Sequence, residues 1–231
     1  MKRFFGERKG ENIIVGGDEF FHMKKVLRLQ EGEEIIVCLN DENDYFCTIE
    51  HFAKDHAVCF VIKTEKNRAL PKKRIALFQM MPKKEYFDNI LPKAIELGVS
   101  EIHFFTSAYT MNKTFKSQRV ATQVMTACKQ CERSKLVDVD LVKFEDIKTL
   151  LSSYQKVIFA YEKEEKMFSP SMLDGCQSIA VIIGNEAGFT SEEANKIKSW
   201  GATSISLGNR ILRCDTAVVA TLSLVGILSG V

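Results

Sequence analysis

Two glycine-containing loops late in the chain carry the residue types best suited to holding a ligand. The segment Ile179–Asp215 reads as an apolar strand, the loop Gly184–Phe189, a helix that Thr190 and Glu193 can cap, a short strand and a second glycine loop. Loops that follow parallel strands meet at one edge of a sheet, where α/β proteins bind ligands. Neither loop contains Gly-Lys-Ser/Thr, so a nucleoside triphosphate is disfavoured. Backbone-rich loops of this kind suit a flat, uncharged adenosine.

Charged side chains in both loops could act on a bound substrate. Glu186 lies between two glycines, and Arg213 comes two residues before Asp215. An arginine beside two carboxylates at the mouth of a loop is a candidate site, because such groups perturb one another's ionisation. The apolar pair Ile211 and Leu212 is unusual for a plain solvent loop and suits an adenine. In the simpler interpretation, Glu186 is an ordinary surface residue and Arg213 only pairs with a neighbouring carboxylate.

Positive charge is concentrated in one stretch of the chain. Residues 71–135 hold 12 lysines and arginines against 5 acidic residues, whereas the segments before and after this stretch are net negative. A local excess of this kind is expected of a protein that binds a polyanion such as RNA. A solvated, lysine-rich helical face would give the same count, so both interpretations stay open.

Cysteine usage and the chain ends bear on the compartment. The seven cysteines lack the spacing of a disulfide framework, and the first ten residues lack the apolar core of a signal peptide. These features predict a reducing, cytoplasmic location. The lone pair Cys128 and Cys131 has no second pair at zinc spacing, so no metal is expected. The apolar segment Thr216–Val231 is too short to span a bilayer, so no membrane is expected either, and a buried helix at a subunit interface is favoured.

Hydrophobic periodicity divides the chain into two domains. Residues 1–68 read as short strands between polar turns, which is typical of a small β-barrel. Within them, Asp18 is expected to cap a short helix that runs through Val26. Residues 69–231 alternate between strands and helices, which predicts a mostly parallel sheet covered on both faces. Pro92 in the first helical stretch of this domain predicts a kink or a restart.

The expected elements of the second domain can be stated by residue range. The strands are expected at 75–79, 101–106, 157–160, 179–183 and 203–206, and the helices at 83–97, 116–133, 144–151, 191–200 and 217–231.

Two signatures resemble those of a known enzyme family. The stretches IGNEAGFTSEE and LGNRILRCDTA resemble the paired signatures of the RsmE family, within the SPOUT superfamily of trefoil-knotted methyltransferases. In that family the first usually reads Ile-Gly-Pro-Glu-Gly-Gly-Phe and the second Leu-Gly-x-Arg-Ile-Leu-Arg-x-Glu-Thr-Ala. Further stretches resemble family segments in the same order along the chain, namely Arg3–Phe5, His22–Arg28, Lys93–Val99 and Gln130–Arg133.

Three positions depart from the family pattern. Asn185 stands where the family usually has proline, Ala187 where it usually has glycine, and Asp215 where it commonly has glutamate. Without the fixed φ of proline, the first loop is expected to be looser. Alanine is expected to be tolerated at 187 unless the position needs a positive φ.

The resemblance implies a fold, a cofactor and a reaction. The fold would be α/β, with a C-terminal trefoil-knotted SPOUT methyltransferase domain on a mostly parallel sheet, preceded by a small PUA-like β-barrel domain that binds RNA. The reaction would be methylation of a specific uridine at N3 in 16S ribosomal RNA of the small subunit, by a homodimer joined through the C-terminal helix. The cofactor S-adenosylmethionine would be held by Ala160, Tyr161, Glu162, Ile183, Gly184, Asn185, Glu186, Ala187, Gly188, Leu207, Gly208, Ile211, Leu212 and Arg213.

Catalytic and RNA-binding roles can then be assigned to residues. Arg213 is expected to orient or stabilise the developing uridine anion, since arginine cannot serve as a base at neutral pH. Glu186 and Asp215 are the candidates for accepting the N3 proton or for positioning Arg213. Phosphate contacts are expected from Arg3, Arg28, Lys113, Lys116, Arg119 and Arg133.

Two other functions fit parts of the sequence. A knotted enzyme could instead methylate a ribose 2′-hydroxyl of tRNA. A non-catalytic RNA-binding assembly factor would keep the barrel and the basic segment but would not need the late glycine loops. A Rossmann-like methyltransferase is disfavoured, because it would have a glycine-rich loop after an early strand and only Met80–Lys83 follows Ile75–Gln79.

Overall fold

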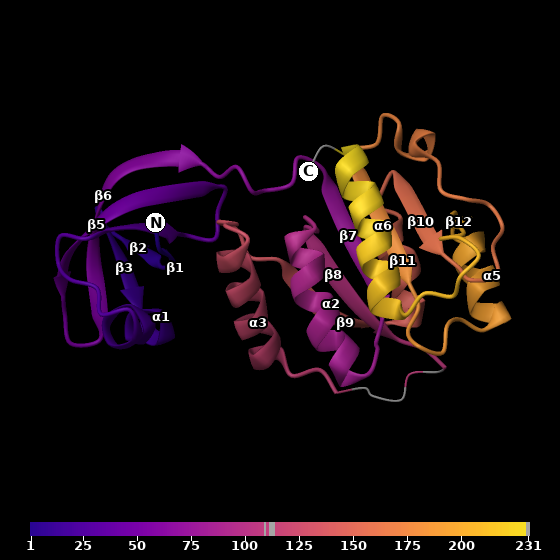
Figure 1. Ribbon diagram of the computed structural model, residues 1–231, viewed down its shortest axis with the longest axis horizontal. Helices are drawn as coiled ribbons and strands as arrows, with labels where there is room; N and C mark the ends of the chain where they lie inside the picture. Colours follow the sequence, from indigo (N-terminus) through magenta and orange to yellow (C-terminus); the bar gives the residue numbers. More distant parts are fainter. Residues whose placement is uncertain (109, 111–113, 230–231) are drawn as a thin grey trace. The chain divides into compact units, whose positions relative to one another are not determined.

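The chain folds into two compact units. The computed structural model describes residues 1–108, 110 and 114–229 (Figure 1). One unit comprises Met1–Leu70 with Cys128–Leu136, and the other comprises Pro71–Ala127 with Val137–Val231. The boundary expected after residue 68 lies close to the end of the first of these segments. The return of the segment 128–136 to the first unit was not predicted.

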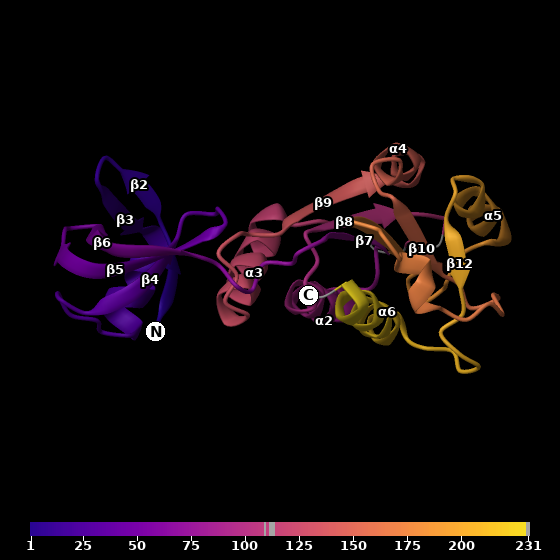
Figure 2. The ribbon, with the colours of Figure 1, turned by 90° about the horizontal axis from the view of Figure 1, so that it is seen from above.

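The first unit is built on a curled six-stranded sheet in the order β1-β4-β5-β6-β3-β2 (Figure 2). Neighbouring strands run antiparallel except β1 and β4, which are parallel. The core inside the curl includes Phe4, Ile13, Met23, Ile35 and Ile49. The strands are β1 Arg3–Phe5, β2 Glu7–Lys9, β3 Asn12–Gly16, β4 Glu34–Cys38, β5 Asn43–Phe52 and β6 His56–Lys66.

The helical segment of the first unit differs from the prediction. It consists of α1 Gly17–Phe21 followed by a π-helix, η1 His22–Val26. The residue at the N-cap is Gly16, and no side chain caps the helix. The prediction that Asp18 caps it is therefore wrong. Asp18 lies in the first turn, where a negative charge is still favourable beside the helix N-terminus.

The segment 128–136 belongs to the first unit because polar contacts fasten it there. It contains the last residues of α3 Ser117–Gln130. Lys129 Nζ lies 2.7 Å from a carboxylate oxygen of Glu19. Ser134 Oγ donates a hydrogen bond of 2.8 Å to a backbone carbonyl in the turn after β4, that of Asp41. Such contacts join residues about 100 positions apart, which periodicity along the sequence cannot indicate.

The second unit contains a six-stranded sheet in the order β12-β10-β11-β7-β8-β9, and every neighbouring pair is parallel. Figure 2 shows α2 and α6 on one face of this sheet and α4 and α5 on the other. The predicted α/β architecture is thus confirmed, while the knot stays a prediction. The strands are β7 Arg74–Met80, β8 Glu101–Thr106, β9 Asp138–Lys143, β10 Lys156–Ala160, β11 Ser178–Ile183 and β12 Thr203–Ile205. The helices are α2 Lys84–Glu96, α3, η2 Phe144–Asp146, α4 Ile147–Leu151, η3 Pro170–Leu173, α5 Ser191–Ser199 and α6 Cys214–Ser229.

The core on the α4 and α5 side is rich in aromatic rings. Phe78, Phe105 and Phe159 come from three strands and belong to one cluster with Phe189 from the loop after β11, whose ring contacts Phe105 and Phe159. The rings of Phe159 and Phe189 pack edge to face with centroids 5.0 Å apart. This packing anchors the loop after β11 to the sheet, because a buried ring cannot leave without exposing apolar surface.

Helix α2 runs unbroken through its proline. Pro92 lies inside the helix, and Leu91 and Ala94 beside it are fully buried. Burial of this face offsets the hydrogen bond that the proline nitrogen cannot donate. Of the two outcomes predicted for Pro92, the restart is wrong, and the kink stays a prediction. In the part of the chain that the structure describes, none of the helices has the length and apolar character needed to cross a bilayer.

A charged network lies at the amino ends of the central strands. His103 Nδ1 lies 2.8 Å from Asp140 Oδ1, and Nε2 lies 3.4 Å from Glu101 Oε2. Arg74 donates two hydrogen bonds to Glu101 and stacks over the ring of Tyr154 at 4.4 Å. Burial alone would lower the pKa of His103, but the bonds to the two carboxylates raise it to about 9. Burial would raise the pKa of Glu101, but its partners lower it to about 2.

This network predicts that stability falls in mild alkali. Because the pKa of His103 rises on folding, its charged form stabilises the protein below about pH 6.5, and this contribution is lost as the pH rises through about 9. His103→Gln should lower the free energy of unfolding by roughly 1–3 kcal/mol near neutral pH. Urea unfolding should be measured between about pH 6.5 and pH 9. The difference in the free energy of unfolding between wild type and variant should shrink as the pH rises. A gap that stays constant would contradict the assignment.

Candidate functional site

A cavity of about 830 Å³ opens at the carboxyl edge of the second unit's sheet. Its walls are the segments that follow β10, β11 and β12, because parallel strands deliver their following loops to the same edge. Every residue expected to bind the cofactor lines this cavity. The residues that the family resemblance implies therefore share one cavity, and the binding role of each stays a prediction.

The cavity also has lining residues that the sequence did not indicate. Tyr86 comes from the first turn of α2, far from the glycine loops in sequence. No local pattern marks it, since its position depends on how α2 packs on the sheet. The remaining unpredicted lining residues are Glu164, Glu165, Ser206, Asn209, Arg210, Cys214 and Ala217.

The shape of the first loop depends on its glycines. Gly188 adopts φ +68°, and a Cβ there would lie 3.0 Å from Glu162 Oε1. A Cβ on Gly184 would lie 3.0 Å from ring carbon Cε2 of the buried Phe189. A side chain at position 184 would therefore press on the packing behind the loop, whereas at position 188 the positive φ is what disfavours one, because the exposed Glu162 side chain can move aside. Ala187 has no positive φ, which explains why alanine is tolerated there.

The helix after the first loop begins as predicted. Thr190 Oγ1 accepts a hydrogen bond of 3.1 Å from the backbone N–H of Glu193, and Glu193 Oε2 accepts one of 2.9 Å from the N–H of Thr190. This reciprocal capping box fixes the start of α5 and hence the end of the loop.

The second loop brings an arginine and apolar side chains to the cavity. Gly208 adopts φ +107° and donates a hydrogen bond of 3.2 Å to Ser206 Oγ. Ile211 is 88% exposed, so it forms a lip of the cavity rather than a buried wall. Leu212 is half-buried and Arg213 is exposed. An exposed guanidinium at a cavity rim is available to a substrate.

The two candidate carboxylates lie near the same thiol. Burial raises the pKa of Cys214 to about 12, and the charges of Glu186 and Asp215 contribute to this rise. Glu186 and Arg213 line the cavity. Asp215 is not among the lining residues and lies in the first turn of α6. Asp215 Oδ1 accepts a hydrogen bond of 3.0 Å from the N–H of Thr216. Of the three predicted catalytic residues, Glu186 and Arg213 thus line the cavity and Asp215 does not, and their catalytic roles stay a prediction.

Two of the arginines expected to contact phosphates, Arg3 and Arg133, are buried. Arg3 forms an ion pair with Asp44 and a hydrogen bond of 3.1 Å with Cys38 Sγ. Its side chain is 8% exposed, and Arg133 as a residue is 3% exposed. Burial lowers the pKa of Arg133. A phosphate would have to displace packed protein to reach either group, so neither is among the RNA contacts that we propose.

The other expected contacts lie on the surface or outside the described residues. Arg28 and Lys116 are exposed. Arg119 is partly exposed but lies 2.6 Å from Asp88 Oδ2, so its charge is already partly neutralised. Lys113 lies outside the described residues.

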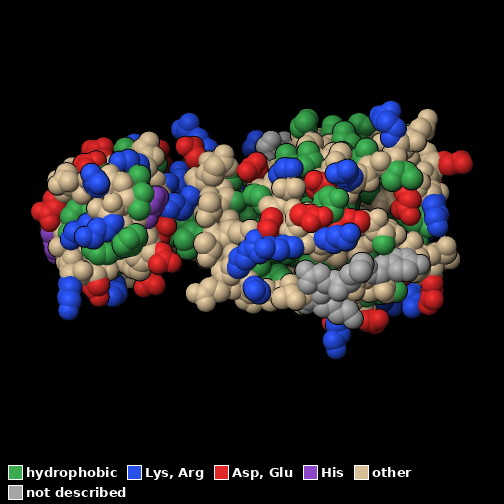
Figure 3. Space-filling view, turned by 60° about the horizontal axis from the view of Figure 1, so that its bottom comes forward, with side chains coloured by type: hydrophobic (Ala, Val, Ile, Leu, Met, Phe, Trp, Pro, Cys, Tyr) green, Lys and Arg blue, Asp and Glu red, His purple; other side chains and the backbone are tan. Residues whose placement is uncertain are grey.

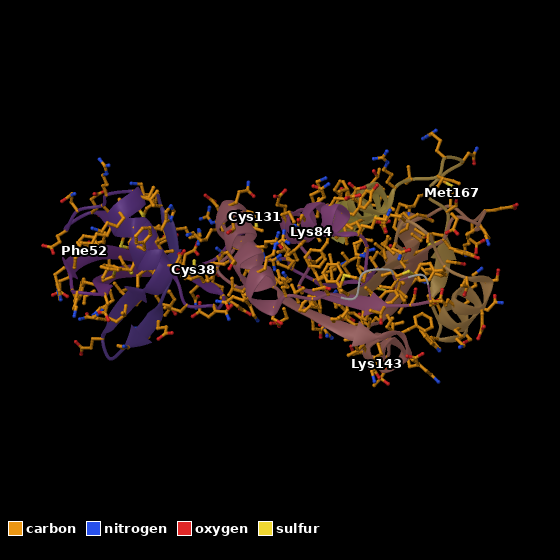
Figure 4. All side chains as sticks on the ribbon, turned by 90° about the horizontal axis from the view of Figure 1, so that it is seen from below. Cys38, Phe52, Lys84, Cys131, Lys143 and Met167 are labelled. Carbon is orange, nitrogen blue, oxygen red and sulfur yellow. The ribbon has the colours of Figure 1, made fainter. Side chains whose placement is uncertain are left out.

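The described cysteines and acidic residues do not form the grouping that a metal site requires. All seven cysteines are free thiols; Cys38 and Cys131 are labelled in Figure 4. Within the ranges 1–108, 110 and 114–229, no cluster of three or more histidine, cysteine, aspartate or glutamate side chains is placed to hold a metal ion.

Comparison with protein families gives two matches. An RNA methyltransferase domain matches residues 68–226, and an RNA methyltransferase PUA domain matches residues 15–62.

Individual relatives match along most of their length. A protein of Bacillus subtilis named "Ribosomal RNA small subunit methyltransferase E" is 29% identical over 244 residues, covering 96% of this chain and 95% of its own. The protein of the same name from Aquifex aeolicus is 27% identical over 226 residues, covering 94% of this chain and 95% of its own.

Solved structures share the fold. The ribosomal RNA small subunit methyltransferase E of Neisseria gonorrhoeae, bound to S-adenosyl methionine, superposes with a TM-score of 0.87 at 23% identity, covering 99% of this chain and 98% of its own. The putative methyltransferase Lpg2936 of Legionella pneumophila, in complex with SAM, gives a TM-score of 0.84 at 23% identity, covering 99% of this chain and 96% of its own.

Contact between the first loop and the core predicts a specific coupling. Gly184→Ala should lower the free energy of unfolding by about 1–3 kcal/mol, because the new Cβ must displace the ring of Phe189. Phe189→Leu removes the ring carbons that the Cβ would meet. In a double-mutant cycle, Gly184→Ala should therefore cost less when it is combined with Phe189→Leu than when it is made alone. Additive losses would show that the ring is not what excludes a side chain at position 184.

Proposed function

We propose that this chain, which belongs to the family of RNA methyltransferases, transfers the methyl group of S-adenosylmethionine to N3 of a uridine in 16S ribosomal RNA of the small subunit. The resemblance to the RsmE family inferred from the sequence is confirmed by the matches above. The single observation that carries the proposal is the cavity between the late glycine loops. It lies at the edge of a parallel sheet and is lined by the two segments that resemble the family signatures.

The lining of the cavity fits S-adenosylmethionine. A volume of about 830 Å³ lies within the range of small-ligand sites in proteins. The loops Gly184–Gly188 and Leu207–Arg213 offer backbone polar groups to an adenosine, and Glu162 and Glu186 offer carboxylates to a cationic ligand. Two related structures are described as binding this cofactor. When bound, it supplies an electrophilic methyl carbon.

The chain's own residues must then align the uridine and remove its N3 proton. Alignment alone can lower a barrier by about 7–11 kcal/mol at best, and a positioned base adds roughly 10²–10⁴-fold. Arg213, exposed at the rim, stabilises the uridine anion as N3 loses its proton. Glu186 and Asp215 are the proton-acceptor candidates, since Glu186 lines the cavity and both carboxylates act electrostatically on the neighbouring Cys214. The target base must leave its stack to enter the cavity.

Recognition of the RNA is proposed to use exposed cations and two subunits. Figure 3 shows Lys and Arg side chains interspersed with acidic ones over the second unit. Arg28 and Lys116 are the exposed candidates for phosphate contacts. On α6, Ile227 is 77% exposed and Leu224 and Leu228 about 40%. An apolar helix face of this kind is proposed to pack against a second copy of the chain. We place the enzyme in the cytoplasm, where free thiols persist.

Mass mapping of ribosomal RNA tests the proposal directly. Small subunits purified from a strain that lacks this protein should gain one methyl group when incubated with the protein and S-adenosylmethionine. Fragmentation should place that group on the base of one uridine. Methylation of a tRNA ribose would favour the first alternative from the sequence, and binding of RNA without any methyl transfer would favour the assembly factor.

Removal of the rim arginine should affect turnover more than cofactor affinity. Arg213→Ala should lower kcat roughly 10²–10³-fold, the loss typical when one group that stabilises a transition-state anion is removed. Calorimetry should show a much smaller change in the affinity for S-adenosylmethionine. Arg210→Ala is the matched comparison, because Arg210 lines the same cavity. Equal losses in the two variants would show that positive charge alone, not Arg213, is needed.

Neutralising the exposed cations should reduce the salt dependence of RNA binding. Each lost phosphate contact should lower the slope of log K against log salt by about 0.7–0.9. The double variant Arg28→Ala with Lys116→Ala should therefore show a shallower slope, whereas Lys148→Ala on α4, also exposed, should not. Affinity measured between low and moderate salt checks this. An unchanged slope would remove Arg28 and Lys116 from the interface.

A further inference from the structure

The first glycine loop begins where a strand pairing ends. Strands β7 and β11 pair in parallel register up to Gln79 and Ile183. Beyond this pair the backbone pairing of the two strands ends, but Gln79 Nε2 donates a hydrogen bond of 3.0 Å to the carbonyl of Gly184. Gln79 is fully buried, and the same nitrogen lies 2.8 Å from the carbonyl of Met80. A side chain thus continues the link between the two strands by one residue.

Asn185 makes the next link and also shapes the loop. Its Nδ2 donates to the carbonyl of Met81 at 3.4 Å. Its Oδ1 accepts a hydrogen bond of 3.0 Å from the N–H of Ala187, which closes an Asx turn. Its backbone carbonyl accepts one of 3.1 Å from Gly188. Asn185 is 9% exposed, so these bonds are largely shielded from water.

Glu186 makes a third hydrogen bond between the first loop and the stretch from the end of β7 to the start of α2. Its Oε1 accepts a hydrogen bond of 2.9 Å from the N–H of Lys83, the N-cap residue of the helix. Lys84, the first residue of α2, is labelled in Figure 4. A carboxylate there satisfies an N–H that the helix leaves unpaired. Tyr86, in the first turn of α2, lines the cavity, so the loop and the start of α2 form neighbouring walls.

We propose that Asn185 is a positioning residue for the methyl donor. Its side chain holds the loop 184–188 against the connection between β7 and α2, in the geometry that lines the cavity. Related signatures carry proline here, which restricts the loop through its fixed φ. Asparagine achieves the restriction through side-chain hydrogen bonds instead. This inference rests on the proposed function, since it concerns the site that would hold S-adenosylmethionine.

Two substitutions separate the bonds of Asn185. Asn185→Ala removes both the bond to Met81 and the Asx turn. Asn185→Asp keeps an acceptor for the N–H of Ala187 but has no donor for the carbonyl of Met81. Asn195→Ala is the matched control, because Asn195 is exposed on α5 and does not line the cavity.

Calorimetry with S-adenosylmethionine and steady-state kinetics on small subunits test the proposal. Asn185→Ala should weaken the affinity for S-adenosylmethionine roughly tenfold, the equivalent of about one net hydrogen bond. Asn185→Asp should weaken it at least about threefold. The KM for the donor should rise while kcat at saturating donor changes less than about threefold, a split that general misfolding would not give. Asn195→Ala should match wild type.

Two outcomes would overturn the inference. One is a folded Asn185→Ala protein whose donor affinity lies within about twofold of wild type, a change smaller than one net hydrogen bond. If that variant does not fold, the same result for Asn185→Asp overturns it, since Asp preserves the size and the Asx turn. Failure of the wild-type protein to bind S-adenosylmethionine would instead refute the proposed function, so the two failures are distinguishable.

Discussion

The parallel pairing of β11 with β7 and β10 is the interaction on which the site depends. Residues 74–79 and 178–183 pair in register although about 100 positions separate them. Closing so long a loop costs conformational entropy, which the burial of Ile179–Ile183 must offset. Because all the pairings are parallel, the loops after β10, β11 and β12 leave from one edge. With one strand reversed, its loop would emerge at the opposite edge and the cavity would lose a wall.

The features predicted correctly from the sequence are those with local causes. The apolar run at Ile179–Ile183 indicates a strand buried on both faces, and Thr190 with Glu193 indicates the start of a helix. By contrast, β9 Asp138–Lys143 escaped prediction because it is a half-exposed edge strand with charged residues at both ends and in its middle. Tyr86 escaped because only the packing of α2 brings it to the cavity. Walls made by sequential loops can be predicted, whereas a wall supplied by a distant helix cannot.

The charge of a side chain in the sequence does not indicate whether that side chain reaches the surface. Arg3 and Arg28 are equally cationic in the sequence, yet Arg3 is paired internally with Asp44, 41 residues away, and Arg28 is exposed. The direction of a side chain depends on the partner that tertiary folding brings to it. A count of lysines and arginines therefore locates a basic segment but not the residues that meet a phosphate. The same limit explains the burial of Arg133 within a stretch that is strongly positive overall.

The departures from the family pattern follow the same division between local and tertiary causes. Ala187 can replace glycine because its φ is not positive, and this condition is set by its own backbone. We propose that Asn185 takes the place of proline through its bond to the carbonyl of Met81, whose position depends on the register between β7 and β11. The loop can thus keep its geometry when the proline ring is replaced by an asparagine side chain that hydrogen-bonds to the neighbouring segment. The strand pairing that places the cavity also supplies the partner that makes this exchange possible.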